Sequence, residues 1–137
     1  MSQSAFTLQH LEKIIRECWS AETAWAPEVW HRSHPSAGQC WSSSYVLRSL
    51  LGGEIIVAEV VPTTVPKQRH SWNRFPSGLE VDLTREQYSP EQRFSECVVP
   101  ESLVHSVAGK QAELLLARVQ ATLSSKVIFP GVAASDA

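Results

Sequence analysis

The sequence has little of what marks a disulfide scaffold, a membrane span or a nucleic-acid-binding surface. Its three cysteines are an odd number at wide spacing, which fits neither a disulfide framework nor paired C-x-x-C zinc knuckles. No apolar run approaches the roughly 20 residues of a membrane-spanning helix, and the N-terminus lacks the apolar core of a signal peptide. Lys and Arg are scattered and the formal net charge is −2. We therefore expect a cytoplasmic protein without nucleic-acid or membrane partners.

What the sequence does contain is typical of one folded domain. Apolar residues make up 43% of the 137-residue chain and charged residues 19%. A chain of this length buries about two thirds of its unfolded surface, enough for a core without disulfides. We expect a single α+β domain over residues 1–130. The small residues of 131–137 indicate a flexible C-terminal tail.

Apolar spacing predicts helices at both ends of the chain. Residues 6–19 have apolar side chains mostly three and four residues apart, the pattern of a helix that packs one face on a core. The same spacing predicts a last helix, whose apolar face would consist of Ala112, Leu115, Leu116, Val119 and Leu123. Residues 20–38 show no sustained period, so we expect an ordered but irregular loop.

A third helix is predicted from Cys40 to Leu51. Gly52 and Gly53 follow it, and glycine commonly ends a helix because it adopts the left-handed conformation without strain. This assignment places Cys40 at a helix N-terminus.

The middle of the sequence predicts strands. Residues 54–61 read EIIVAEVV, a nearly continuous β-branched run that predicts a central strand. Residues 70–75 and 79–83 flank a turn-forming Pro-Ser-Gly, which predicts an antiparallel hairpin. Thr84 and Gln87 have the spacing of a capping box, which indicates a short helical turn. We expect residues 89–96 to be a loop.

Cys40, His70 and Asp82 form the candidate catalytic set. A cysteine is an effective nucleophile only as the thiolate, and both a helix N-terminus and a nearby imidazole lower the thiol pKa. In this arrangement Cys40 would attack a carbonyl group and His70 would exchange the proton. Asp82 would fix the tautomer of the imidazole.

The hairpin register decides whether His70 and Asp82 meet. An odd loop, for example residues 75–77, would place His70 directly opposite Asp82 on one face of the sheet. A two-residue loop would place them on opposite faces, because side chains alternate along a strand.

Backbone N–H groups at the helix start, beginning with that of Cys40, would bind the oxyanion of the reaction. Further candidates for a second oxyanion donor or for pocket walls are Gln39, Trp41, Trp72, His34 and Asn73. No cofactor is expected.

The motifs around these residues resemble known families. Gly38-Gln39-Cys40-Trp41 is similar to the nucleophile segment of papain-type peptidases. His70-Ser71-Trp72 and Asp82-Leu83-Thr84 resemble the transglutaminase-like branch of that superfamily. Together with Leu-Gly-Gly-Glu-Ile at 51–55, these motifs are most similar to the small bacterial YunG-like proteins. Papain-type enzymes have glutamine six residues before the cysteine, where this chain has His34.

The resemblance implies a papain-like fold in the broad sense, with a cysteine-bearing helix packed on an antiparallel sheet. With the ordered triad, it favours an acyl-transfer enzyme that acts as a hydrolase, deamidase or transferase. The substrate would be a peptide, a protein or a small amide or thioester.

Two alternatives belong to other classes of protein. The first is a binding module that keeps the scaffold and the pocket without turnover. The second is a small zinc-binding protein with mixed nitrogen and sulfur ligands, namely His31, His34, Cys40 and His70.

Overall fold

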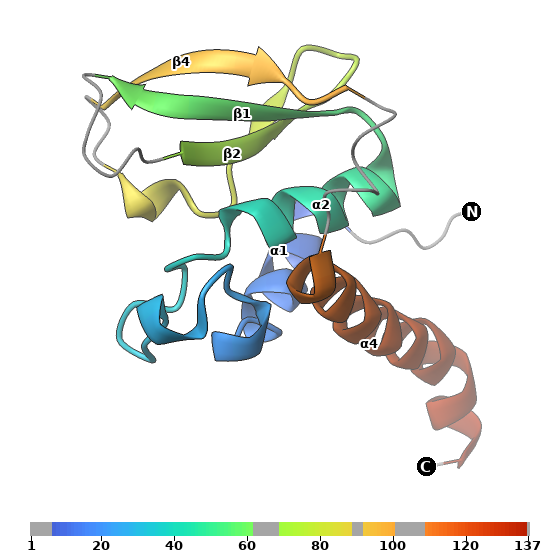
Figure 1. Ribbon diagram of the computed structural model, residues 1–137. Helices are drawn as coiled ribbons and strands as arrows, with labels where there is room; N and C mark the ends of the chain where they lie inside the picture. The colour runs from blue at the N-terminus through green and yellow to red at the C-terminus, as the bar shows by residue number, and fades with distance from the viewer. Residues whose placement is uncertain (1–6, 62–68, 89–91, 101–108, 137) are drawn as a thin grey trace.

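The computed structural model describes residues 7–61, 69–88, 92–100 and 109–136, without the side chains of 60, 96–98 and 126–136 (Figure 1). Over these residues the protein is α+β, as predicted. It contains the helices α1 (Leu8–Glu17), α2 (Cys40–Leu51) and α4 (Gly109–Asp136), and the strands β1 (Glu54–Val61), β2 (Arg69–Arg74), β3 (Glu80–Val81) and β4 (Arg93–Val98). The strands form one antiparallel sheet in the order β3-β2-β1-β4.

Helix α2 lies between the sheet and the other two helices (Figure 1). It begins at Cys40 and ends at Gly52, whose φ of +79° suits glycine, so the predicted bounds are confirmed. Helix α1 begins after Thr7, whose side chain accepts a hydrogen bond from the backbone N–H of His10 (3.1 Å). Its predicted apolar stripe is confirmed, because Leu11, Ile14 and Ile15 are buried.

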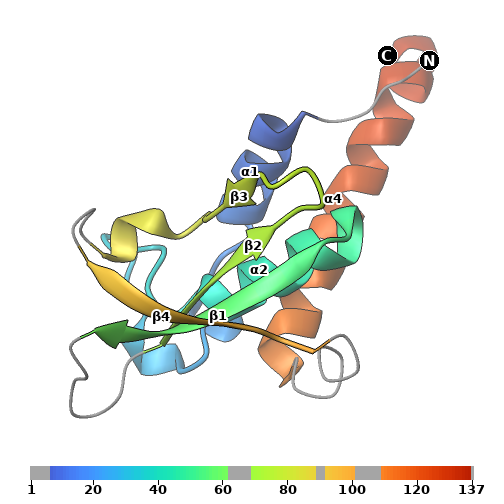
Figure 2. The same ribbon diagram turned by 90° about the horizontal axis from the view of Figure 1, so that it is seen from above.

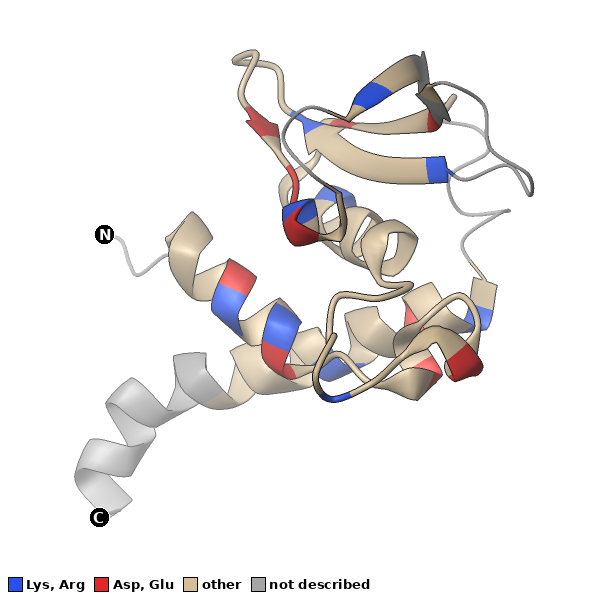
Figure 3. Cartoon of the chain, turned by 90° about the vertical axis from the view of Figure 1, so that its left-hand side faces the viewer, with Lys and Arg blue, Asp and Glu red and all other residues tan. Residues whose placement is uncertain are grey.

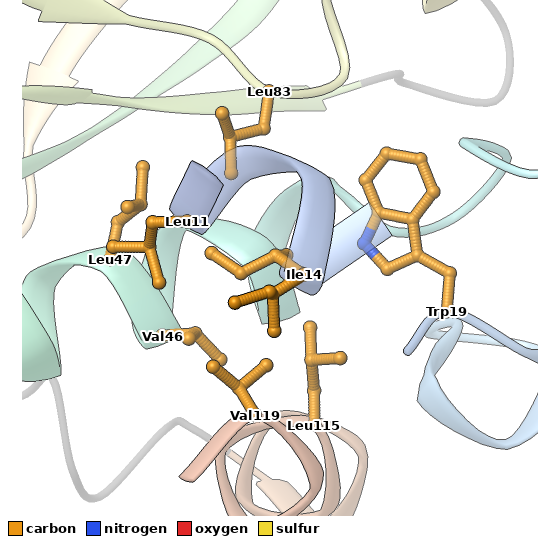
Figure 4. Packing of buried hydrophobic residues seen from close by; sticks show 9 residues of the cluster. Leu11, Ile14, Trp19, Val46, Leu47, Leu83, Leu115 and Val119 are labelled. Carbon is orange, nitrogen blue, oxygen red and sulfur yellow. The ribbon is translucent and has the colours of Figure 1, made fainter. Parts of the chain in front are cut away.

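The main core joins α1, α2 and α4 (Figure 4). Its buried members are Leu11, Ile14, Ile15, Trp19, Val46, Leu47, Leu83, Leu115 and Val119. Burial of each such side chain contributes about 1.5–3 kcal/mol to folding before conformational entropy is subtracted. Helix α2 therefore has one face fixed in this core.

Strand β1 is central, as predicted, because β2 and β4 pair with its two edges. The expectation of a loop over 89–96 was wrong for its second half, where β4 begins at Arg93. Every residue from Arg93 to Val98 pairs with β1, in a register that opposes Val57 and Cys97. Such pairing between distant segments has no local sequence signal.

The turn of the hairpin is longer than the three-residue loop that the sequence analysis gave as an example. Arg74 pairs with Glu80, so the loop spans the five residues 75–79, and β3 contains only Glu80 and Val81. The backbone N–H of Phe75 donates to the carbonyl of Leu79 (2.8 Å) and closes this wider loop. From above, β3 lies toward α1 and β4 at the opposite edge (Figure 2).

The segments beside the hairpin and at the termini complete the fold. A 3₁₀ turn over Arg85–Gln87 confirms the predicted helical turn, but Thr84 makes no side-chain cap there. Residues 20–38 contain two further 3₁₀ turns, Ala21–Thr23 and Pro27–Val29. Helix α4 extends to Asp136, into the segment expected as a tail, whose flexibility stays a prediction.

Charged side chains of both signs are interspersed over the described surface, for instance along α1 (Figure 3). Among the described residues, no helix is long and apolar enough to cross a membrane.

Candidate active site

Cys40 is the first residue of α2 and is partly buried. The preceding residue, Gln39, accepts the hydrogen bond of the Ser43 N–H with its backbone carbonyl (2.9 Å). The backbone N–H groups of the first helical turn have no partner within the helix, so a partial positive charge lies beside the thiol. This position favours the thiolate and an oxyanion formed next to it.

His70 and Asp82 are in direct contact. The Nε2 atom of His70 lies 2.6 Å from Oδ2 of Asp82. If the observed register is continued, position 82 lies opposite position 72, so His70 and Asp82 are diagonal neighbours on one face. The prediction that an odd loop brings them together is confirmed, although the pairing is displaced by two residues.

The Asp82 carboxylate is fixed by a tight turn. Its Oδ1 atom accepts hydrogen bonds from the backbone N–H of Thr84 (3.1 Å) and from the Thr84 hydroxyl (3.3 Å). Thr84 is thus a donor to Asp82 rather than a capping-box residue. The carboxylate is oriented before any substrate binds, which leaves Oδ2 for His70.

The other ring nitrogen of His70 is free for a further partner. His70 is only 2% exposed, and its Nδ1 has no hydrogen-bond partner among the described residues. Burial by itself raises the pKa of Cys40, but hydrogen bonding to His70 and its charge, together with hydrogen bonds from the hydroxyl and backbone of Ser71, outweigh burial and lower that pKa.

His70 shows the complementary shift. Burial favours the neutral ring, but the hydrogen bonds and negative charges of Asp82 and Cys40 raise the pKa of His70 to about 9. The two shifts both favour a thiolate beside an imidazolium, because each charge stabilises the other.

An aromatic cluster encloses the His70 ring. The ring centroids of Trp72, Tyr88 and Phe94 lie 5.8, 5.0 and 5.5 Å from that of His70. Aromatic faces stabilise a nearby cation and limit the access of water to it. Burial, and then the charge of Cys40, raises the pKa of Tyr88, so its phenol stays neutral.

A cavity of about 1070 Å³ opens from the thiol. It lies between the 25–41 segment and the 86–88 segment, and Cys40 itself forms part of its wall. Gln87 also lines it, donating with Nε2 to the Ser36 carbonyl (2.9 Å), while its buried Oε1 has no partner among the described residues.

The five pocket candidates divide into two groups. His34 and Trp41 line the cavity beside Cys40. Gln39, Trp72 and Asn73 do not, because their polar groups are used inside the fold. Asn73 donates to the Ser44 carbonyl (2.9 Å) and so ties β2 to α2, and the Trp72 indole donates to Glu80 (2.7 Å).

Gln39 has a structural role that the sequence did not indicate. Its side chain is fully buried, accepts from the Thr23 hydroxyl (2.7 Å) and donates to the Ser20 carbonyl (2.9 Å). Its amide is therefore directed away from the cavity. These bonds attach the 20–38 loop to the residue immediately before the nucleophile.

The zinc alternative is wrong for the described residues. No group of three or more His, Cys, Asp or Glu side chains lies close enough there to hold a metal ion. His31 and His34 are exposed on the loop surface, and the Nδ1 of His34 pairs with the Ser33 hydroxyl (3.0 Å).

Sequence reasoning missed four contributors to the site: Trp25, Ser71, Tyr88 and Phe94. Ser71 carried a usable signal, because it follows His70 directly on the strand that faces α2. The others are aromatic residues in segments without periodicity, and only the folded chain brings them to the site.

Fold and site together define a small α+β protein in which a helix that begins with a cysteine packs against the strand that carries the histidine of a histidine–carboxylate pair. The model of the YunG protein family matches residues 7–124, so this chain belongs to that family. No curated protein and no solved structure matches it.

Proposed function

We propose that this YunG-family protein is a cysteine-nucleophile acyl-transfer enzyme. Cys40 is the nucleophile, His70 the acid and base, and Asp82 the residue that orients His70. The single observation that carries the proposal is the 2.6 Å contact of His70 Nε2 with Asp82, which leaves Nδ1 for the thiol. The lowered pKa of Cys40 agrees with this arrangement.

The reaction begins with attack of the Cys40 thiolate on the carbonyl carbon of an amide or thioester. Backbone N–H groups at the start of α2 stabilise the oxyanion that forms. His70 gives its proton to the leaving amine or thiol as the bond to the carbonyl breaks. Water or another acceptor then attacks the acyl-enzyme, loses a proton to His70 and releases Cys40 as thiolate.

The same arrangement supports a distant papain-like or transglutaminase-like relationship. In both, a helix that begins with the cysteine packs on an antiparallel sheet that supplies the histidine. The order Cys, His, Asp along the chain agrees as well. We include this relationship in the proposal because the architecture and the motifs favour it independently of each other.

The proposal is tested by the rate at which iodoacetamide alkylates each cysteine between pH 5 and pH 10. Intact-mass and peptide mass spectrometry separate Cys40 from Cys18 in the same molecule. We expect Cys40 to react well ahead of Cys18 at pH 7 and to lose that advantage in His70→Ala. His10→Ala, which changes an exposed histidine on α1, is the matched control and should behave as wild type.

Equal, slow alkylation of both cysteines would contradict a catalytic thiol. A fast Cys40 that is unaffected by His70→Ala would contradict the proposed pair. In either case the cavity would be that of a binding module rather than of an enzyme.

A further inference from the structure

The cavity wall that faces Cys40 is mainly apolar and aromatic. Trp25, Val29, Trp41 and Tyr88 all line it. The Trp25 side chain is 69% exposed, so most of its apolar surface stays in contact with water in the folded protein. An exposed indole at the mouth of a site is a surface available to a ligand.

The two charged side chains on the wall already face opposite charges. The Glu86 carboxylate accepts from both terminal nitrogens of Arg16, at 2.7 and 3.3 Å. Arg69 is 67% exposed and lies 3.9 Å from Glu59. A charged ligand group in the cavity would have to compete with these pairs, whereas a neutral group would not.

The loop that presents Trp25 is fixed in place. The Trp25 N–H donates to the Gly38 carbonyl (3.0 Å), which closes the loop beside the nucleophile. Gly38 has a φ of +74°, and a Cβ there would lie 2.8 Å from Cγ2 of Val29. Gln39 attaches the same loop to the start of α2 through its side-chain bonds with Thr23 and Ser20. The wall is therefore built before a ligand arrives.

We propose that this cavity receives the acyl group of the substrate, and that the acyl group is uncharged and aromatic. The inference rests on the proposed acyl transfer, because the thiolate and the aromatic wall share one cavity. An acyl chain on Cys40 would share the cavity with the indoles of Trp41 and Trp25. Stacking on indole rings favours an aromatic ring over a short alkyl chain of equal reactivity.

Three p-nitrophenyl esters test this inference, those of propanoic, 3-phenylpropanoic and 3-(4-carboxyphenyl)propanoic acid. All three have the same unbranched chain of two saturated carbons next to the carbonyl, so their intrinsic reactivities are close. In each reaction the Cys40 sulfur forms a bond to the carbonyl carbon, and the ester C–O bond breaks to release p-nitrophenolate. Rates of Cys40 acylation by intact mass are divided by the rates with N-acetylcysteine.

We expect 3-phenylpropanoyl transfer to be at least about tenfold faster than propanoyl transfer, and faster than the carboxylated analogue. Trp25→Ala should reduce the aromatic preference to within about twofold. Because its indole is exposed and its loop bond uses the backbone, this variant should fold normally. Leu79→Ala removes an exposed apolar side chain from the hairpin loop, outside the cavity lining, and should keep the preference.

Failure of the inference is distinct from failure of the enzyme proposal. Acylated Cys40 without an aromatic preference, or with a preference for the carboxylated ester, would overturn the inference alone. If no ester acylates Cys40, the acyl-transfer proposal fails. Ligand-detected NMR with Cys40→Ala then compares the binding of 3-phenylpropanamide and propanamide. Absence of selective binding of the aromatic amide would also contradict a cavity that binds aromatic groups.

Discussion

Cys18 and Cys40 lie at opposite kinds of helix end. Cys18 is the C-terminal cap of α1, where backbone carbonyls concentrate negative charge, and Cys40 is the first residue of α2, where N–H groups concentrate positive charge. Both thiols are partly buried. Burial raises the pKa of Cys18, whereas the pKa of Cys40 is lowered in spite of burial. Burial alone therefore does not decide which thiol is reactive.

The two thiols have different neighbours. A hydrogen bond with Thr122 and then the charge of Arg118 lower the pKa of Cys18, but together they do not offset burial. The Arg118 guanidinium donates to the Cys18 carbonyl (3.2 Å) and the Ser20 hydroxyl (2.8 Å). His70 has one nitrogen occupied by Asp82 and the other left for Cys40. The Arg118 guanidinium already donates to a carbonyl and a hydroxyl group, so it stabilises a thiolate at Cys18 less than the His70 imidazolium stabilises one at Cys40.

The largest expected effect comes from weakening that imidazolium. Asp82→Asn removes the carboxylate charge but keeps an oxygen that can accept from Thr84, so the turn should persist. The pKa of His70 should fall from about 9 toward its ordinary range. Alkylation of Cys40 should then be less fast relative to alkylation of Cys18. Because one pKa unit corresponds to a tenfold change in ionisation, we expect alkylation of Cys40 at pH 7 to slow by roughly 10- to 100-fold.

The matched control for Asp82→Asn is Glu80→Gln. Glu80 lies on the same hairpin but accepts from the Trp72 indole rather than from His70. Alkylation of Cys40 and the NMR titration of the His70 ring should stay as in wild type in this variant. Equal slowing in both variants would mean that the hairpin, and not the Asp82 charge, supports Cys40.

The pH dependence of the free energy of unfolding should also distinguish Cys40 from Cys18. In the folded state the pKa of Cys40 is lowered and that of His70 is raised to about 9, so the folded pair keeps its proton on His70 where the unfolded pair keeps one on the thiol. The two states therefore differ little in the number of bound protons, and stability through this pair depends only weakly on pH in wild type. In Cys40→Ala, Asp82 still raises the pKa of His70, so the folded state binds more protons than the unfolded state above pH ~6.5.

Stability of Cys40→Ala should therefore fall as pH rises from about 6.5 through the His70 pKa, by at most about 1.4 kcal/mol per pH unit. Urea unfolding at pH 6.5, 7.5 and 8.5 measures the slope. Cys18→Ala is the control and should keep the wild-type slope between pH 6.5 and 7.5, because burial raises the pKa of Cys18 and its thiol stays protonated there in both states. Parallel slopes for the two alanine variants would contradict proton sharing between Cys40 and His70.

The sequence predicted the helix start at Cys40 and the contact between His70 and Asp82 because the signals for both are local. Gly52 ends α2, and the motif that contains Cys40 begins it. The odd hairpin loop was sufficient to bring His70 and Asp82 together, since a register displaced by two residues keeps the same face. Strand β4 was not predictable in the same way, because its pairing with β1 joins distant segments.

The role of Gln39 could not be predicted from the sequence. A polar residue beside a nucleophile suggests an oxyanion donor, and the sequence does not reveal that Thr23 and Ser20 occupy its amide. Hydrogen-bond partners of a buried amide are set by the packing of segments that are far apart in sequence.

The smallest expected effect concerns Ser71, whose hydroxyl and backbone both lower the pKa of Cys40. Ser44 donates to the Ser71 hydroxyl (3.3 Å), so the thiolate lies at the end of a short chain of hydroxyl groups. Ser71→Ala removes the hydroxyl contribution but leaves the backbone N–H and His70. One hydrogen bond contributes about 0.5–1.5 kcal/mol, so alkylation of Cys40 at pH 7 should slow by roughly two- to tenfold.

Ser43→Ala is the control for Ser71→Ala, because its hydroxyl accepts from the Trp19 indole (2.9 Å) on the core side of α2. It should leave the alkylation rates of both cysteines unchanged. If Ser71→Ala instead slowed Cys40 as much as Asp82→Asn does, the hydroxyl chain would be the main stabiliser of the thiolate. The contrast between Cys18 and Cys40 would then depend on neutral donors rather than on the imidazolium, and the acid–base role of His70 would lose its support.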